Sequence, residues 1–205
     1  MSVRREGHTT NTALAPRVHP TAVVESEATL GDGTSVWHHA HVRDGALVGA
    51  SCTLGKNVFV DGGARVGDRV KIQNNVSVYT GVTLEDDVFV GPSAVFTNDL
   101  HPRAFATTWH VTATVVRRGA SIGANATIVC GVEIGSFAMV AAGSVVTRDV
   151  EPHRLVMGNP ARPRGWVCTC GAPMPSIHPD VAPEATAPCP SCALPWRRGL
   201  SEETT

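Results

Sequence analysis

The 205-residue chain has no long apolar segment. No run approaches the roughly 18 apolar residues that a transmembrane helix needs. The N-terminal stretch MSVRREGHTTNT contains no apolar run of the kind that signal peptides carry. We therefore expect a cytoplasmic protein without a membrane partner.

An excess of charge of one sign is also missing. The 17 Lys and Arg residues and 18 Asp and Glu residues leave a net charge of −1, which gives no electrostatic attraction to nucleic acid or to a membrane surface. Aromatic residues make up only 5% of the chain. A large aromatic core is therefore excluded, and the many Val, Ala and Gly residues favour a core of thin layers of small side chains.

What the chain does contain is a six-residue repeat. An aliphatic residue recurs at every sixth position from Val18 to Val90, and Phe96 occupies the next position. The repeat then stops and resumes in another phase from Val116 to Val146. The residue four places after each of these positions is small or aliphatic. Such regularity indicates a stacked repeat architecture.

A second periodic signal marks the turns. The third residue after each repeat position is Gly, Asn or Asp in thirteen of the twenty units, including Gly33, Asn57 and Asn75. These residue types tolerate a positive φ. We therefore expect each unit to be a short strand that ends in a tight turn with a left-handed residue, and alternate strand residues to face inward.

This pattern resembles the hexapeptide repeat of left-handed parallel β-helices. The resemblance implies an all-β fold in which three units form one triangular coil, with about seven coils over residues 17–158 and one extruded loop at 97–115. Residues 1–16 would form an N-terminal tail. Residues 159–205 would form a small Cys-rich extension with a zinc-ribbon-like element. The resemblance also implies a homotrimer.

Several longer motifs go beyond the repeat consensus. They are VWHHAHV at 36–42, LGKNVFV at 54–60, VKIQNNVSVY at 70–79, VFVGPSAVFTN at 88–98, RRGASIGANATIVCG at 117–131 and VMGNPAR at 156–162. Together they resemble the N-acetyltransferases that acetylate the 3-amino group of a nucleotide-linked amino sugar, either UDP-2-acetamido-3-amino-2,3-dideoxy-glucuronate or a dTDP-3-amino-dideoxyhexose. The resemblance implies acetyl-CoA as the donor, direct attack by the amine, and a role in surface polysaccharide synthesis. It leaves the nucleotide carrier and the sugar open.

Two residues are the catalytic candidates. The family places a polar residue beside the sugar amine at the position of Asn98, which could otherwise be a turn residue at the start of the loop. Glu85 stands where many units have glycine, and its carboxylate could accept a proton or orient the amine, or simply lie at a solvated corner. Val132 occupies the place where some acetyltransferases of this fold have a histidine base. A base would then be His101 or His110 in the loop, or another histidine, or absent.

Four residues are candidates for binding the nucleotide sugar. His38 and His41 match the family motif, and either could instead be the base. Asn74 is expected to stack above Lys56, and Lys56 above His38, as a polar ladder on one corner that contacts either the nucleotide or only solvent. Arg103 could bind a carboxylate or phosphate in a bidentate manner, or be a surface residue of the loop.

The motifs at 141–146 and 156–162 resemble the acetyl-CoA-binding end of these proteins. The resemblance implies that the pantetheine arm runs along a groove between subunits and contacts backbone groups, where glycine allows close approach. An arginine, either Arg162 or Arg154, would contact the phosphates. The candidate residues are Ala142, Gly143, Gly158, Asn159, Pro160 and Arg162.

Four of the six cysteines form two close pairs, Cys168 with Cys170 and Cys189 with Cys192. In a cytoplasmic protein, paired cysteines favour a metal over disulfides, and four thiolates suit a structural zinc ion. The first pair has one intervening residue instead of the usual two, and the second lacks a following glycine. A reduced, partly disordered tail is therefore the alternative.

Two other classes of function remain open at this point. The chain could be an O-acetyltransferase or another small-amine acyltransferase of the same fold. It could also be a non-catalytic trimeric binding module. A purely structural β-helix has no need for a polar loop inside its repeat, which favours an enzyme.

Overall fold

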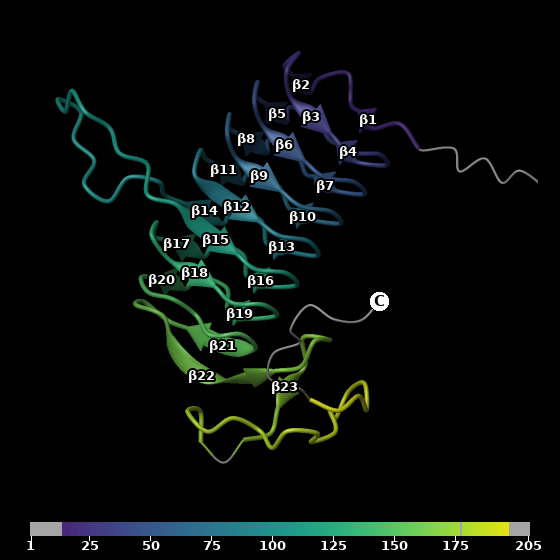
Figure 1. The fold of residues 1–205 in the computed structure, drawn as a ribbon, viewed down its shortest axis with the longest axis vertical. Coiled ribbons are helices and arrows are strands. Elements are labelled where there is room, and N and C mark those ends of the chain that lie inside the picture. Colours follow the sequence, from purple (N-terminus) through teal and green to yellow (C-terminus); the bar gives the residue numbers. More distant parts are fainter. Residues whose placement is uncertain (1–13, 177, 197–205) are drawn as a thin grey trace, which may run out of the picture.

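The computed structural model describes residues 14–176 and 178–196, and this part of the chain is built from short strands without any helix. The chain winds into a parallel β-helix in which three successive strands make one coil. The coils stack along one axis, as the ordered series of strand labels in Figure 1 shows. The predicted all-β solenoid of hexapeptide repeats is thereby confirmed.

The strands form three sheets, here called sheets A, B and C. Sheet A contains β1 (Arg17–Val18), β4 (Ser35–Val36), β7 (Thr53–Leu54), β10 (Lys71–Ile72), β13 (Phe89–Val90), β16 (Ser121–Ile122) and β19 (Met139–Val140), and continues through β21 (Arg154–Met157), β22 (Arg162–Val167) and β23 (Pro173–Met174). Sheet B contains β2 (Val23–Val24), β5 (His41–Val42), β8 (Phe59–Val60), β11 (Ser77–Val78), β14 (Val95–Phe96), β17 (Thr127–Ile128) and β20 (Val145–Val146). Sheet C contains β3 (Thr29–Leu30), β6 (Leu47–Val48), β9 (Arg65–Val66), β12 (Val82–Leu84), β15 (Thr114–Val116) and β18 (Glu133–Ile134).

Neighbouring strands in each sheet are parallel and in register. Ser35 of β4 lies beside Thr53 of β7, eighteen positions later in the chain. The register survives the interruption of the repeat, because Leu84 of β12 pairs with Val116 of β15. Only residues 97–113, between β14 and β15, leave the stack as a loop, which projects from the upper left of the body in Figure 1. The predicted break is therefore present, although β15 already begins at Thr114.

The interior is a set of columns of small and aliphatic side chains. Below sheet B, Val42, Val60, Val78, Phe96 and Ile128 succeed one another in consecutive coils, and none is more than 1% exposed. Burial of one such side chain contributes roughly 1.5–3 kcal/mol. The same contribution recurs from coil to coil, and these side chains form one continuous core along the stack.

The turns contain residues with positive φ, as the repeat predicts. Some of these residues are of types other than Gly, Asn and Asp. Asn57, Asn75 and Asp87 have positive φ, but so do Arg69 and Phe137. A left-handed conformation costs such side chains roughly 1–2 kcal/mol. The turn amides donate to the preceding coil, as Arg69 N does to Ala50 O at 2.7 Å, and this stacking overrides local preference.

The last coil is followed by a different arrangement. Strand β21 still pairs in parallel with β19, but β22 turns back and pairs antiparallel with β21, and β23 pairs antiparallel with β22. The predicted boundary at residue 158 falls in the turn between β21 and β22. We call residues 162–176 and 178–196 the C-terminal cap, which lies at the lower end of the stack in Figure 1.

Most of the predicted N-terminal tail, residues 1–13, and the end of the predicted extension, residues 197–205, lie outside the described residues. In the described part of the chain no helix is long and apolar enough to cross a membrane.

A matched pair of glycine substitutions tests the coil spacing. A Cβ on Gly91 would lie 2.6 Å from the backbone nitrogen of Ala124 in the next coil, whereas one on Gly45 would meet only Gly63 N at 3.8 Å. Gly45→Ala should cost roughly 1–2 kcal/mol because Gly45 has a φ of 78°. Gly91→Ala should lower the melting temperature clearly more, because backbone must move. Thermal unfolding followed by circular dichroism measures both, and equal losses would contradict this packing argument.

Candidate functional site

The candidate residues lie at three different corners of the prism. We call these the AB, BC and CA corners, after the two sheets that each connects. His38, Asn74 and Gly143 lie at the AB corner, Asn98 at the BC corner, and Glu85 at the CA corner. A single chain therefore does not bring its candidate residues together into one cluster.

Asn98 lies at the neck of the loop, two residues after β14. Its main-chain oxygen accepts a hydrogen bond from Thr112 N at 2.9 Å, which closes the neck. Its side-chain Nδ2 donates to Thr80 O of the preceding coil at 3.3 Å. Among the described residues none donates to Oδ1 of Asn98, so a partly buried amide oxygen in a fixed orientation is available to a ligand.

The loop beyond Asn98 is exposed along most of its length. Arg103 is exposed, and its guanidinium donates only to the neighbouring Pro102 O. The alternative bases His101 and His110 are also exposed. The apolar side chain of Phe105 is 83% exposed, which is unusual for a phenylalanine. The loop therefore exposes charged, titratable and apolar side chains that the rest of its own chain does not cover.

Glu85 is held by neighbouring groups at the CA corner. Its carboxylate accepts hydrogen bonds from Arg117 Nη1 at 2.7 Å and from the backbone nitrogen of Arg118 at 2.9 Å. The neighbouring Asp86 accepts from the backbone nitrogen of Asp68 in the preceding coil, and Asp68 accepts from that of Ala50 one coil earlier. Glu85 borders a groove on sheet C. Its contacts with Arg117 and Arg118 nevertheless give its carboxylate a structural role that needs no substrate.

The two histidines that are predicted to bind substrate have different surroundings. His41 Nε2 lies 2.6 Å from Glu25 Oε1. The pKa of Glu25 is lowered by the backbone amide of Asp44 and then by His41. His38 is exposed and stacks on His19, with ring centroids 3.5 Å apart. His41 is thus oriented by a partner, whereas His38 belongs to a stacked pair on the surface.

An aromatic ladder on sheet B was not found by sequence reasoning. The rings of His41 and Phe59 are 5.6 Å apart, and those of Phe59 and Tyr79 are 6.1 Å apart, both edge-to-face. The next coil along the stack contains Asn98. The eighteen-residue spacing of His41 and Phe59 could have revealed the first contact. Tyr79 falls two residues out of this register, so its contact depends on side-chain direction.

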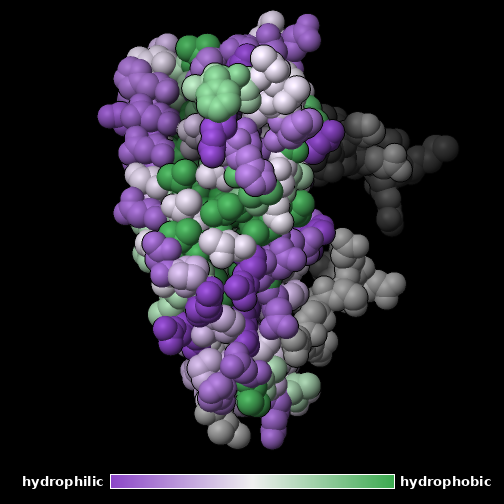
Figure 2. All heavy atoms as spheres, turned by 90° about the vertical axis from the view of Figure 1, so that its left-hand side faces the viewer, coloured by the Kyte–Doolittle hydropathy of each residue, from purple (hydrophilic) through white to green (hydrophobic). Residues whose placement is uncertain are grey.

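The ladder lies on an apolar face. Figure 2 looks onto the left-hand side of Figure 1, where the sheet B strands are labelled, and shows hydrophobic side chains gathered in the middle of this face between polar margins. Val23 and Val95 of this sheet are 54% and 48% exposed. A contiguous apolar strip of this kind is typical of a surface that contacts a ligand or another subunit.

The polar ladder predicted at the AB corner is present. Asn74 Oδ1 accepts a hydrogen bond from Lys56 N at 2.8 Å, and Asn57 Nδ2 donates to Asn75 Oδ1 at 3.0 Å. Asn75 has the expected positive φ. The amide of Asn74 thus joins two coils, which gives it a structural task beside any contact with substrate.

The acetyl-CoA candidates come together at the far end of the same corner. Gly158 O accepts a hydrogen bond from Val145 N at 3.0 Å, which brings the turn after β21 against the turn that holds Ala142 and Gly143. No atom lies within 4 Å of the Cβ position of Gly143. Ala142, Gly143, Gly158, Asn159 and Pro160 are all exposed, so this part of the surface is accessible to a ligand.

The structure distinguishes the two arginine alternatives. Arg162 is exposed, and its Nη1 donates to Ala161 O at 2.9 Å. Arg154 is 5% exposed, donates to Pro179 O and Asp180 Oδ1, and stacks over Trp166. Arg154 is therefore committed to the cap, and only Arg162 is free to meet a phosphate.

The cysteines divide into two groups. Cys52 and Cys130 are buried in the β-helix, where Cys52 Sγ donates to Gly67 O. Cys168, Cys170, Cys189 and Cys192 converge in the cap. The backbone amides of Cys192 and Ser191 lower the pKa of Cys189 to about 6.

Comparison with known proteins identifies the family. Residues 63–98 match the bacterial transferase hexapeptide (six repeats), and residues 44–80 and 118–148 match the hexapeptide repeat of succinyl-transferase. The chain is 42% identical over 153 residues to dTDP-3-amino-3,6-dideoxy-alpha-D-galactopyranose 3-N-acetyltransferase of Aneurinibacillus thermoaerophilus, a match that covers 75% of this chain and 79% of the relative. It is 36% identical over 150 residues to serine acetyltransferase 4 of Arabidopsis thaliana, which covers 73% of this chain and 29% of that relative.

A solved structure has the same fold. It is a variant of perosamine N-acetyltransferase from Caulobacter crescentus in complex with CoA and GDP-perosamine, with a TM-score of 0.51 and 24% identity over 75% of this chain and 58% of the other. The chain thus spans just over half the length of that protein. The fold and the sequence matches define a hexapeptide-repeat transferase. More particularly, the chain belongs to the family of acetyltransferases that contains the Aneurinibacillus enzyme, as its motifs indicated.

Substitution of the two arginines separates binding from stability. Arg162→Ala should raise the KM for acetyl-CoA roughly 10- to 100-fold, the equivalent of one charge-assisted hydrogen bond, and leave the melting temperature unchanged. Arg154→Ala should lower the melting temperature, because it removes the buried guanidinium that donates to Pro179 O and Asp180 and stacks on Trp166. It should leave the KM at low temperature near the parent value. The reverse pattern would exchange the two roles.

Proposed function

We propose that the protein transfers the acetyl group of acetyl-CoA to the 3-amino group of a nucleotide-linked 3-amino sugar. The observation that carries this proposal is the 42% identity that extends over 79% of a 3-N-acetyltransferase for such a sugar. The similar fold of a protein solved with CoA and GDP-perosamine agrees with it. Both substrates are highly charged and cross membranes poorly, so we place the reaction in the cytoplasm.

The proposed reaction is a direct displacement. The neutral amine nitrogen attacks the thioester carbonyl, the carbon–sulfur bond breaks after the tetrahedral intermediate, CoA leaves as the thiol, and the amine proton passes to solvent or to a base. Asn98 holds the amine through its free Oδ1, which directs the nitrogen lone pair toward the thioester. His101 and His110 stay as alternative bases. The carboxylate of Glu85 already accepts hydrogen bonds from Arg117 and Arg118, so we assign Glu85 a structural role in joining its coil to the next one.

The nucleotide sugar lies along sheet B in this proposal. The ladder of His41, Phe59 and Tyr79 offers ring faces and edges to a base or sugar, and it leads toward the coil of Asn98. The distance from β5 to β14 is three strand spacings, roughly 14 Å, which suits an extended nucleotide sugar better than a small amine. His38 and Asn74 border this path at the AB corner. Arg103 meets the negative charge of a phosphate or a uronate.

A homotrimer completes the site. Asn98 is at the BC corner, whereas the acetyl-CoA candidates Gly143 and Gly158 are at the AB corner of the same chain. A second copy that packs against sheet B would bring its own AB corner beside the loop and cover Phe105 and the apolar strip. The acetyl group and the amine would then meet between two subunits. Light scattering of the purified protein measures the stoichiometry.

A substrate panel tests the proposed function. The full-length protein is incubated with acetyl-CoA and, in separate reactions, UDP- and dTDP-linked 3-amino sugars, the corresponding 3-hydroxy sugars, and serine. We expect release of free thiol and a mass gain of one acetyl group only with the 3-amino sugars. Acetylation of serine or of a hydroxy sugar alone would favour the O-acetyltransferase alternative, and binding without turnover would favour the non-catalytic module.

Asn98→Ala tests the positioning of the amine. Loss of the amide should lower kcat for the 3-amino sugar about 100-fold or more, since a misplaced nucleophile forfeits much of the effective molarity. The control is Asp99→Ala, which removes only the hydrogen bond to His101 N within the same loop and should retain most of the activity. If Asn98→Ala retains full kcat while Asp99→Ala does not, the assignment is wrong.

A further inference from the structure

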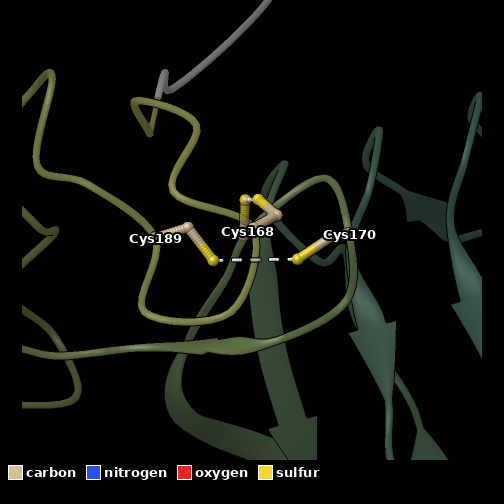
Figure 3. A group of neighbouring side chains, drawn as sticks. Cys168, Cys170 and Cys189 are labelled. Carbon is tan, nitrogen blue, oxygen red and sulfur yellow. Dashed lines mark hydrogen bonds between the residues drawn. The ribbon is translucent and has the colours of Figure 1, made fainter.

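Four cysteine sulfur atoms meet in the C-terminal cap. Cys168 Sγ and Cys192 Sγ are 3.7 Å apart, and so are Cys170 Sγ and Cys189 Sγ. All four sulfur atoms lie within 4.8 Å of one another. Figure 3 shows the side chains of Cys170 and Cys189 pointing toward each other, with Cys168 beside them.

These distances fit a tetrahedron of thiolates around a metal ion. Four Zn–S bonds of about 2.3 Å place neighbouring sulfur atoms about 3.8 Å apart, whereas a disulfide requires about 2.05 Å. Soft thiolate ligands in a closed tetrahedral site favour zinc among divalent ions. We infer that the cap binds one zinc ion through Cys168, Cys170, Cys189 and Cys192.

The backbone around each cysteine pair supports this inference. Gly171 follows the first pair with a φ of 86° and donates to Cys168 O, and Ala193 follows the second with a φ of 58° and donates to Cys189 O. In both turns the residue after the second cysteine is left-handed and donates to the first cysteine, although the second turn is one residue longer and lacks the glycine usual at this place. Ser191 N also donates to Cys189 Sγ at 3.5 Å, which stabilises a thiolate.

The zinc ion has a structural task in the cap. Cys168 and Cys170 follow β22, whereas Cys189 and Cys192 come from the irregular segment 178–196. The core that joins these two segments is small, with Trp166, Met174 and Trp196 as its main apolar members. Units of this size usually need a metal or disulfides to fold. Four thiolates around one ion supply that link.

The same segment closes the end of the β-helix. Trp196 Nε1 donates to Val167 O at 3.2 Å, and the Trp196 ring contacts the buried ring of His153, which stacks on Phe137 of the last coils. Asp180 accepts from Arg154 of β21. Loss of zinc should release these contacts and expose the terminal strands. It should leave acetyl transfer itself intact, because β22 separates the cysteines from Arg162 by roughly 20 Å.

Metal analysis of the full-length protein tests the inference. We expect close to one zinc per chain after purification in a reducing, chelator-free buffer. Replacement by Co²⁺ should give the visible ligand-field bands of a tetrahedral tetrathiolate. Removal of the metal by a strong chelator should change the tryptophan fluorescence, and added Zn²⁺ should restore it. The zinc content of Cys189→Ser should fall at least about tenfold, whereas Cys130→Ser, which removes a buried thiol outside the cluster, should keep its zinc.

The opposite results are equally clear. Far less than one zinc per chain in the parent protein, iron in place of zinc, or a mass that shows two disulfides under non-reducing conditions would overturn the inference. The parent measurements do not depend on the folding of any variant. Retention of zinc by Cys189→Ser would also overturn it. An inactive protein that still binds zinc would count against the proposed function alone.

Discussion

The parallel ladder between successive coils is the constraint on which the rest of this structure depends. Each strand has only two or three residues in most coils, too few to be stable alone, so its backbone hydrogen bonds must be made by the coil before and the coil after. Three consequences follow. Paired residues in neighbouring coils are eighteen positions apart in a regular coil. Inward side chains must be small enough to stack at about 4.8 Å, and each turn must adopt the backbone conformation of the turns above and below it, whichever residue type it contains. Arg69 and Phe137 at left-handed turns show the last of these.

The same constraint explains why function requires a break in the repeat. A regular coil presents only two-residue strands and tight turns, so its surface side chains stand in fixed columns. The loop after Phe96 leaves the stack without disturbing the ladder, because β12 and β15 pair across it in register. The neck of the loop fixes Asn98, while the exposed remainder is free to follow a ligand or a partner. At the CA corner, Glu85 and Arg117 occupy the column that holds Gly49 and Gly67 in earlier coils, and their ion pair joins the two coils on either side of the loop.

Periodicity allowed most of the fold to be predicted, because it assigns every residue to a column. The coils, the loop and the stacking of Asn74 on Lys56 follow from counting in steps of six and eighteen. The partners of individual side chains do not follow. Glu85 contacts Arg117 only because the loop places residue 117 in the next coil, directly beside residue 85. Arg154 is buried and Arg162 is exposed only because of the way the cap folds. The contact of Phe59 with Tyr79 depends on rotamers. The proposed roles of Asn98 and Arg103 involve a second subunit, and the spacing of the repeats carries no information about its position.

The end of the stack poses a problem that its interior does not have. The last coil exposes strand edges and the open ends of its apolar columns, and unprotected edges promote association with other chains. In this chain an antiparallel turn-back, β21 to β22, satisfies the edge of sheet A, while Trp196 contacts His153, which stacks on Phe137 of the last coils. An irregular segment with so few apolar residues cannot hold that position through burial alone. The convergence of four thiols from both halves of the cap supplies the missing constraint. The proposed zinc site therefore stabilises the end of the fold, where no further coil is present to supply backbone hydrogen bonds.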